Sequence, residues 1–297
     1  MRGEAVHWIR HSGWKAVMLL FVAAQLGWGQ LWKLSQEELV ELTKDSPFER
    51  FPDGRPKVPD DLLQKLRDWD IGIEDIIGHA RRKNYDSQYE TGWEVLNPQT
   101  KLVGRAFTVQ FMPARPDLAS FLDIRGRMRN QTAIDMLQAG DVPVVDLYGK
   151  IEAGTFVGDK LAYYVWKTTG TGVVLDGSMF YVQNIQKTGM PAYYRGFHPS
   201  SLRGASITGV NIPVQIGGVT VMPGDVVFGN GEATFFIPPA LVEEIVTSFA
   251  STRYRFEWMK KKFDEKKYKS SEIYGRPKDP ELLKEMEEYV KSKQSQP

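Results

Sequence analysis

The sequence predicts an α/β protein with one mixed sheet, parallel in its first half and meander-like in its second. Short β-type runs at 140–146 and 172–175 enclose an amphipathic helix candidate at 158–167. Strand, helix and strand at this spacing predict a parallel βαβ unit. Four further β-type runs follow at 212–214, 219–221, 225–228 and 233–237. Turn dipeptides such as Pro223-Gly224 separate them, which favours antiparallel connections.

The first 29 residues have the pattern of a secretory signal peptide. Basic residues precede an apolar run at 16–26, and Gly27 and Gly29 provide small residues at the −3 and −1 positions of a cut after Gly29. An uncleaved anchor is the alternative, although the run is shorter than the roughly 20 residues that span a bilayer. We therefore expect an exported, periplasmic or extracellular protein with no stable membrane anchor after cleavage.

Charge and cysteine content narrow the function classes. The chain has 38 Lys and Arg, 37 Asp and Glu, and no Cys. Cleavage after Gly29 removes Arg2, Arg10, Lys15 and Glu4, which leaves a net charge of −1. Near-neutrality argues against nucleic acid as a partner and favours small molecules or proteins. The absence of Cys excludes disulfides, a thiol nucleophile and thiolate metal ligands.

Helical extensions are expected on both sides of the sheet domain, which we place at 99–240. Residues 30–98 form the first extension: Ser35 begins a capping box, and Pro59 precedes acidic residues typical of a first helical turn. These helices are expected to pack onto the domain because they lack a separate core.

The second extension is expected at 241–297. A helix that starts near Pro239 places Leu241, Ile245 and Phe249 on one face, and a last helix is expected at 280–291. Lysines gather between these helices. They fit a solvated charged segment, a helix that packs against a neighbouring subunit, or a polyanion site.

The middle of the chain resembles the RraA-like family. The family's motifs occur in order and spacing at 140–146 (GDVPVVD), 158–161 (GDKL), 172–177 (GVVLDG), 195–196 (RG) and 219–225 (VTVMPGD). The resemblance covers about 102–238. The family includes 4-hydroxy-4-methyl-2-oxoglutarate aldolases and regulators of ribonuclease E activity, and many members were labelled dimethylmenaquinone methyltransferases.

This resemblance implies a swivelling β/β/α domain and a homotrimer or a hexamer made of two trimers, with sites between subunits. The family's aldolases bind Mg²⁺ or Mn²⁺ and cleave a 2-oxo acid through an enolate. Gly158, Asp159, Lys160 and Leu161 match the loop that binds substrate through a helix N-terminus, where free N–H groups favour an anion. Lys160 adds a charge beside that anion or simply faces solvent.

The sequence departs from the family at its Arg-Asp pair. Phe180 and Tyr181 stand at those two positions, and Asn184 stands where an acidic residue is expected. Phe180 cannot neutralise a carboxylate, and a neutral phenol is a poor ligand for a hard divalent cation. A metal therefore needs other ligands. Asp176 and Glu232 are the candidates, and each also fits an ordinary turn carboxylate.

Two functions remain open from the sequence. One is a divergent lyase, an aldolase or decarboxylase that acts on a 2-oxo acid or a related hydroxy-carbonyl compound, with Tyr181 and Lys160 as catalytic residues. The other is a non-catalytic binding or scaffold protein, in which Phe180 and Tyr181 form an aromatic platform. Only His79 and His198 remain after signal cleavage, so a three-histidine zinc site is excluded.

Overall fold

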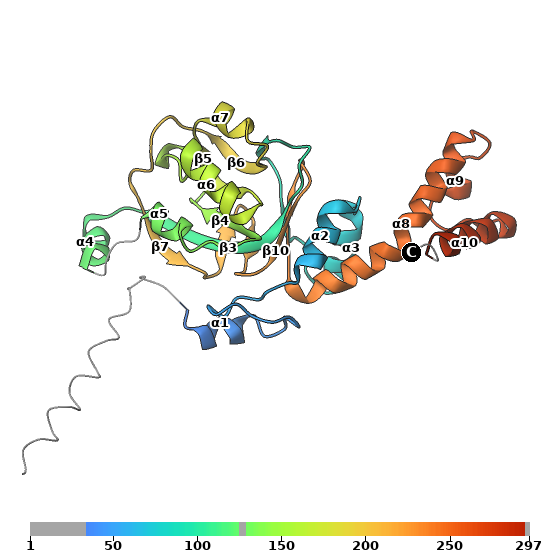
Figure 1. Cartoon of the computed structure of the whole chain (residues 1–297), viewed down its shortest axis with the longest axis horizontal. Coiled ribbons are helices and arrows are strands. Elements are labelled where there is room, and N and C mark those ends of the chain that lie inside the picture. Colours follow the sequence, from blue (N-terminus) through green and yellow to red (C-terminus); the bar gives the residue numbers. More distant parts are fainter. Residues whose placement is uncertain (1–33, 125–128, 295–297) are drawn as a thin grey trace, which may run out of the picture.

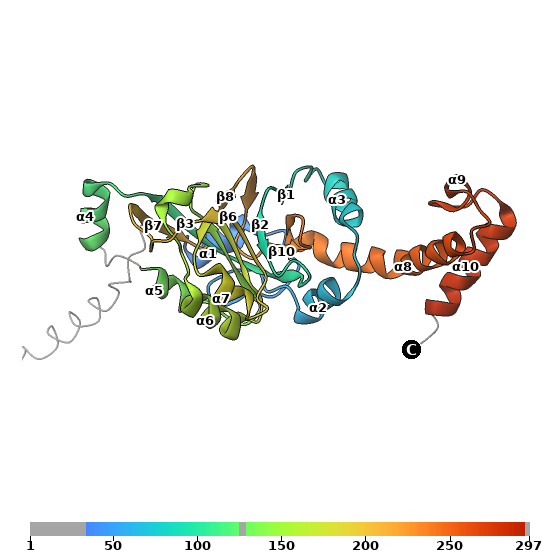
Figure 2. The ribbon, with the colours of Figure 1, turned by 90° about the horizontal axis from the view of Figure 1, so that it is seen from above.

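The computed structural model describes residues 34–124 and 129–294. A curled sheet forms the body, and a helical arm projects from it (Figures 1 and 2). The strand order is β1-β11-β10-β3-β4-β5-β6-β2, and β7 pairs with β3. The predicted signal peptide lies outside the described residues. Within the described ranges, no helix has both the length and the apolar character needed to cross a membrane.

The parallel centre of the sheet follows the predicted βαβ pattern. Its strands are β3 (Leu102–Pro113), β4 (Asp141–Asp146), β5 (Val173–Met179) and β6 (Ala192–Phe197), and each is parallel to the next. The connecting helices are α6 (Asp159–Thr169) and α7 (Val182–Gln186). Three short helices complete this half: α4 (Pro116–Ile124), α5 (Asn130–Ile134) and the 3₁₀ helix η1 (Ile151–Ala153).

Antiparallel strands extend the sheet on both sides. They are β1 (Tyr89–Glu90), β2 (Glu94–Leu96), β7 (Ala205–Val210), β10 (Val226–Gly229) and β11 (Thr234–Ile237). A separate hairpin consists of β8 (Val214–Ile216) and β9 (Val219–Val221). The expected strand at 212–214 thus begins two residues late, after Pro213, which has no N–H to donate to a ladder. Strand β7, which pairs with the second half of β3, was not predicted from the sequence.

The sheet curls until its two ends meet. Where the ends meet, the Tyr193 hydroxyl on β6 accepts a hydrogen bond from the Gly231 N–H of the β10–β11 turn at 2.7 Å. Trp93 donates through Nε1 to the Thr234 hydroxyl on β11 at 3.2 Å and packs edge-on against the Tyr193 ring. The apolar inner face is filled by the β8–β9 hairpin, whose Val214 and other inward side chains join the same core.

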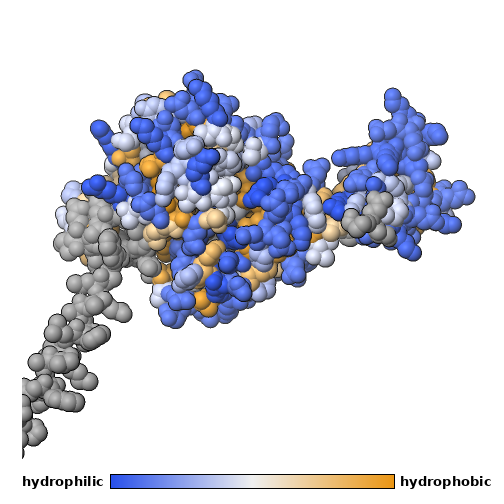
Figure 3. All heavy atoms as spheres, in the orientation of Figure 1, coloured by the Kyte–Doolittle hydropathy of each residue, from blue (hydrophilic) through white to orange (hydrophobic). Residues whose placement is uncertain are grey.

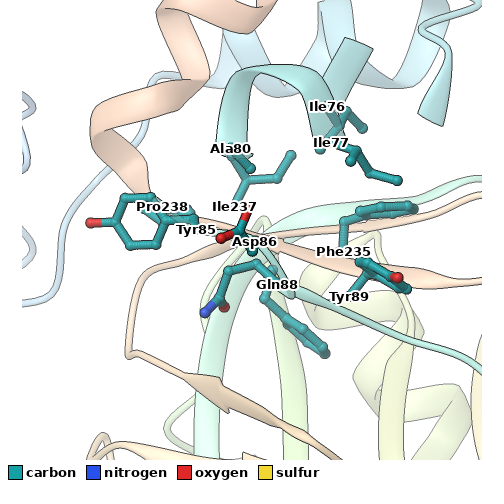
Figure 4. A pocket seen from close by; sticks show the side chains of 11 residues that line it. Ile76, Ile77, Ala80, Tyr85, Asp86, Gln88, Tyr89, Phe235, Ile237 and Pro238 are labelled. Carbon is teal, nitrogen blue, oxygen red and sulfur yellow. The ribbon is translucent and has the colours of Figure 1, made fainter. Parts of the chain in front are cut away.

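Helices cover the outer face in two groups. Helices α5, α6 and α7 pack on β3 to β6. On the other side, α2 (Asp60–Asp68), α3 (Ile73–Arg82) and the first half of α8 (Pro239–Asp264) pack on β10 and β11. Figure 4 shows Ile76, Ile77 and Ala80 of α3 above Phe235 of β11 and Tyr89 of β1. The N-terminal helices therefore share a core with the sheet domain, as expected.

The ends of the described chain match the sequence signals closely. Helix α1 (Gln36–Leu42) starts at Ser35 with the predicted capping box, and α2 follows Pro59. Helix α8 begins at Pro239 and runs on past the body. There it folds back through α9 (Ser270–Ile273) and α10 (Pro280–Gln294) around a small core of its own, which includes Trp258 and Met286.

Candidate functional site at the carboxyl edge of the parallel strands

The first part of the site is the N-terminus of α6, which lies at the carboxyl edge of β4 because the helix runs antiparallel to the strand. Gly158 is the N-cap residue, and no side chain caps the helix. The first-turn N–H groups are therefore left for water or a ligand. Lys160 is exposed, whereas Leu161 is half-buried against the outer core.

Tyr181 lies directly beside this helix start. It follows β5, precedes α7, and has φ 57° and ψ 33°, a left-handed conformation that is uncommon for a residue other than Gly. A Cβ atom placed on Gly158 would lie 3.6 Å from Tyr181 Cδ2, so the ring is in contact distance of that glycine. Tyr181 is nevertheless 48% exposed. The edge of a solvent-accessible tyrosine ring thus lies beside the α6 N-terminus.

Two phenylalanines extend this aromatic surface. The Phe180 ring is 3.9 Å from the Tyr181 ring and 5.7 Å from the Phe197 ring, measured between centroids. Phe197 comes from the end of β6 and is 57% exposed. Exposed aromatic rings grouped in this way favour contact with a flat or apolar ligand surface. The sequence offered no signal for Phe197, since only the pairing of β5 with β6 brings it here.

Asp159 is engaged within the same site. Its Oδ2 accepts a hydrogen bond from the Asn184 side-chain amide at 3.3 Å, which links the first turn of α6 to α7. Asn184 stands where the resemblance to the family leads one to expect an acidic residue. This contact holds the two helix starts together and provides an amide in place of a second carboxylate.

Asp176 faces the inner side of the sheet. Its carboxylate accepts hydrogen bonds from Arg195 Nε at 2.6 Å and from the Gly217 N–H at 3.2 Å. Arg195 also pairs with Glu90 at 3.1 Å, and its guanidinium lies 3.8 Å from the Trp93 ring centroid. Arg195 and Glu90 are therefore partners that sequence reasoning missed; the motif at 195–196 was the only available signal.

A cavity of about 490 Å³ adjoins this ion pair at the carboxyl end of the strands. Gln110, Asp146 and Asp176 line it from adjacent positions on β3, β4 and β5. Burial raises the pKa of Asp146, and the neighbouring Asp176 charge raises it further, against backbone hydrogen bonds from Tyr148 and Gln215 that lower it.

The two predicted metal ligands lie on different elements, Asp176 on β5 and Glu232 in the β10–β11 turn. Glu232 is exposed in the β10–β11 turn, beside Gly229, which pairs with Leu102 at the start of β3. Arg195 pairs with both Asp176 and Glu90. Glu90 on β1 is opposite Thr234, two residues after Glu232, so the curl of the sheet brings this turn toward the same side. The use of Asp176 and Glu232 as metal ligands stays a prediction.

The residues around Tyr181 do not fit a divalent cation within a single chain. Such a cation prefers several carboxylate oxygens. Here Tyr181 stands where the resemblance to the family leads one to expect an Asp, Asp159 is bonded to Asn184, and Asp176 is paired with Arg195. Among the residues that the structure describes, no three His, Cys, Asp or Glu side chains are grouped so that they could hold a metal ion.

Comparisons with known proteins agree with this fold and edge. The family described as "RraA-like: Aldolase/RraA" matches residues 73–233, more than half of the chain. The chain therefore belongs to the RraA-like family. The crystal structure of Streptomyces coelicolor RraAS2, described as an unusual member of the RNase ES inhibitor RraA family, has a TM-score of 0.56 and 26% identity. The similarity covers 75% of this chain and 100% of that one.

Curated relatives align over part of their length. Protein DlpA of Legionella pneumophila is 26% identical over 166 residues, which cover 56% of this chain and 26% of DlpA. A Halalkalibacterium halodurans protein named "Putative 4-hydroxy-4-methyl-2-oxoglutarate aldolase" is 29% identical over 155 residues, covering 51% of this chain and 66% of the relative. The chain thus spans about a quarter of the first relative and just under two thirds of the second.

Proposed function

We propose that this protein is a carbon–carbon lyase that acts on a 2-oxo acid or a related hydroxy-carbonyl compound without a bound metal. The observation that carries the proposal is the position of Tyr181. Its left-handed backbone places the tyrosine ring against Gly158, at the helix N-terminus that family members offer to an anion. Membership of a family that includes named aldolases supports a lyase class.

The chemistry follows from the groups at this edge. The N–H groups of the first turn of α6 hydrogen-bond the carboxylate and developing enolate oxygen of the substrate, and Lys160 adds a positive charge. In the decarboxylation of oxaloacetate, the bond to the leaving carboxylate breaks, CO₂ departs and its bonding electrons form the enolate of pyruvate. The Tyr181 hydroxyl then gives a proton to the enolate carbon and regains one from water.

One observation favours a second function, ligand binding without turnover. Phe180, Tyr181 and Phe197 form a partly exposed aromatic surface where family aldolases have charged groups. Such a surface stacks on a sugar or an aromatic ring. Under this alternative the α6 N-terminus contributes to the fold and the surface contributes to recognition.

Assembly and export enter the same proposal. We propose a homotrimer or hexamer, because the family's sites lie between subunits, and we propose that the mature protein acts outside the cytoplasm. The support for export is the pattern of basic, apolar and small residues in the first 29 positions. Mass determination of the purified protein and N-terminal sequencing of the product secreted by its host test these two points.

The lyase is tested by assaying the purified protein with oxaloacetate and with 4-hydroxy-4-methyl-2-oxoglutarate. Tyr181→Phe retains the ring and removes the proton donor, so we expect kcat to fall about 100-fold, a usual value for a lost general acid, with little change in KM. Lys160→Met is expected to raise KM. Tyr163→Phe and Lys167→Met, exposed on the same helix, are matched controls and should leave both constants unchanged.

A chelator separates the remaining outcomes. Activity that survives EDTA and depends on Tyr181 supports the proposal. Turnover that EDTA abolishes would mean that a metal site is completed between subunits, and the metal-free mechanism would be wrong. An absence of turnover with either substrate, together with binding of an aromatic or sugar ligand that Tyr181→Ala abolishes, would select the binding protein instead.

A further inference from the structure

The arm is a preformed unit that projects from the body (Figures 1 and 2). Helix α8 has 26 residues, about 39 Å at 1.5 Å per residue, and its contacts with the outer core end at Phe249. Beyond that point it is braced by α9 and α10 (Figures 1 and 2). Lys262, only 9% exposed in its side chain, pairs with Glu265 at 3.0 Å and Glu285 at 2.6 Å, which fixes this tip.

A groove separates the arm from the body. It has a volume of about 630 Å³ and lies between the α2–α3 turn and the second half of α8. Trp69 and Phe249 provide part of its lining, and Phe256, Phe263 and Tyr274 face it with 37%, 39% and 76% of their surface exposed. Large aromatic side chains gathered on an exposed surface mark an interaction site.

The body wall of this groove is acidic, whereas the arm wall has two cations and one carboxylate, Arg253, Lys260 and Glu257. The body wall contains Asp68, Asp70, Glu74 and Asp75. The side chain of Asp70 is 94% exposed, and its nearest cation, Lys260, is 4.0 Å away. Such an exposed contact is worth little, which leaves the carboxylate available to a partner.

The arm carries an excess of basic residues. Residues 250–294 contain 13 Lys and Arg against 9 Asp and Glu, whereas residues 34–98 contain 9 against 15. Figure 3 shows the arm as a mostly hydrophilic surface. Lys266 and Lys267, just past the end of α8, are exposed, and no described carboxylate lies within ion-pair distance of either one. The free charge of the arm therefore complements the acidic wall of the body.

We infer that the groove is a docking site for a second copy of this chain. Two copies face each other groove to groove, and the arm of each lies along the acidic α2–α3 turn of the other. The exposed aromatic rings become buried between the arms, and the Lys266 and Lys267 charges meet Asp68 and Asp70 of the partner. A symmetric arrangement of this kind uses the same surface on both copies. Whatever assembly the RraA-like body forms, this contact doubles it.

Charge reversal tests the contact in the full chain. Body reversal is Asp68→Lys with Asp70→Lys, and arm reversal is Lys266→Glu with Lys267→Glu. Each is expected to halve the molar mass of the protein measured by analytical ultracentrifugation, because like charges then face each other. A 1:1 mixture of the two variants should recover the wild-type mass, since each arm again meets a wall of opposite charge. Lys44→Glu with Lys57→Glu changes the net charge equally and should not alter the mass.

Two further results decide the matter. Added NaCl should weaken the wild-type association, because exposed charges are screened over about 10 Å at 0.1 M salt. Circular dichroism of each variant should match the wild type, which shows that the arm remains folded. A wild-type mass equal to that of both reversed variants would overturn the inference, and so would reversed variants that fail to recover the wild-type mass when mixed.

Discussion

Arg55 and Asp141 form a two-pronged ion pair that joins the N-terminal segment to the first residue of β4. The Nη1–Oδ1 distance is 3.0 Å and the Nη2–Oδ2 distance is 3.2 Å, and both side chains are completely buried. Asp53 also accepts from Arg55 Nε at 2.8 Å, and the Phe107 ring lies 5.1 Å from the guanidinium. The segment before α2 is therefore part of the sheet domain's interior.

Removing Arg55 is expected to destabilise the protein strongly. Arg55→Met leaves Asp141 buried without its cation, which costs about 3–5 kcal/mol in the free energy of unfolding. Adding Asp141→Leu should recover part of that loss, because the unpaired charge disappears. Urea denaturation measures both variants. Arg276→Met, which breaks an exposed pair with Glu287, is the control and should cost less than about 1 kcal/mol.

Asp225 should make folding stability depend on pH. It is 3% exposed and accepts a hydrogen bond from the Met222 N–H at 2.9 Å, and burial raises its pKa from 3.8 to about 7. The folded state binds the Asp225 proton more tightly than the unfolded state does. The protonated carboxyl group therefore adds to the free energy of unfolding fully below pH 4, and this stabilisation is lost as pH rises through 7. At about 1.4 kcal/mol per pKa unit, the upper limit of this pH-dependent stabilisation is about 4 kcal/mol.

The variant Asp225→Asn checks this sign. It should match the wild type near pH 4 and be the more stable of the two at pH 8, as measured by thermal unfolding. Asp45 and Asp225 line one pocket, but Asp45 is exposed. Asp45→Asn should therefore leave the pH profile of stability unchanged. Parallel pH profiles for the wild type and Asp225→Asn would contradict a raised pKa.

The substitution Gly→Ala is expected to have opposite effects on stability at two positions, Gly172 and Gly78. A Cβ on Gly172, just before β5, would lie 2.1 Å from the Pro191 carbonyl oxygen, so Gly172→Ala must shift the backbone and should cost about 3 kcal/mol. A Cβ on Gly78, inside α3, would lie 3.7 Å from a flexible Arg82 side chain. Gly78→Ala should therefore stabilise the protein by about 0.5–1 kcal/mol. Chemical denaturation distinguishes the two signs.

Arg195 is expected to stabilise the fold through its ion pairs beside the inner cavity. Arg195→Gln leaves Asp176, whose side chain is 6% exposed, without its cation, and should cost about 3 kcal/mol or more. Arg195→Lys should recover only part of this, because a lysine cannot serve Asp176, Glu90 and the Thr91 carbonyl together. Arg115→Gln, which breaks an exposed pair with Asp117, should be nearly neutral. A Lys variant as stable as the wild type would show that the fork geometry is not needed.

The sequence by itself determined the class of fold, the βαβ unit, most strand and helix positions, and the family. These features depend on local patterns. The Ser35 capping box, the proline before α2 and the apolar face of α8 each involve residues close together in the chain. Hydrophobic periodicity and capping residues can be recognised from such short segments. The replacement of the family's Arg-Asp pair by Phe180 and Tyr181 was likewise recognised from a short segment of sequence.

Only the tertiary structure decided how distant groups meet. Arg195 and Asp176 are 19 positions apart and Glu90 is 105 positions before Arg195, yet all three join on one sheet face because β5, β6 and the curled edge bring them together. The left-handed backbone of Tyr181 has no sequence signal, since non-glycine residues adopt it only where packing imposes it. Partner choice in a curled sheet depends on strand register and closure, and a one-dimensional pattern does not specify either one.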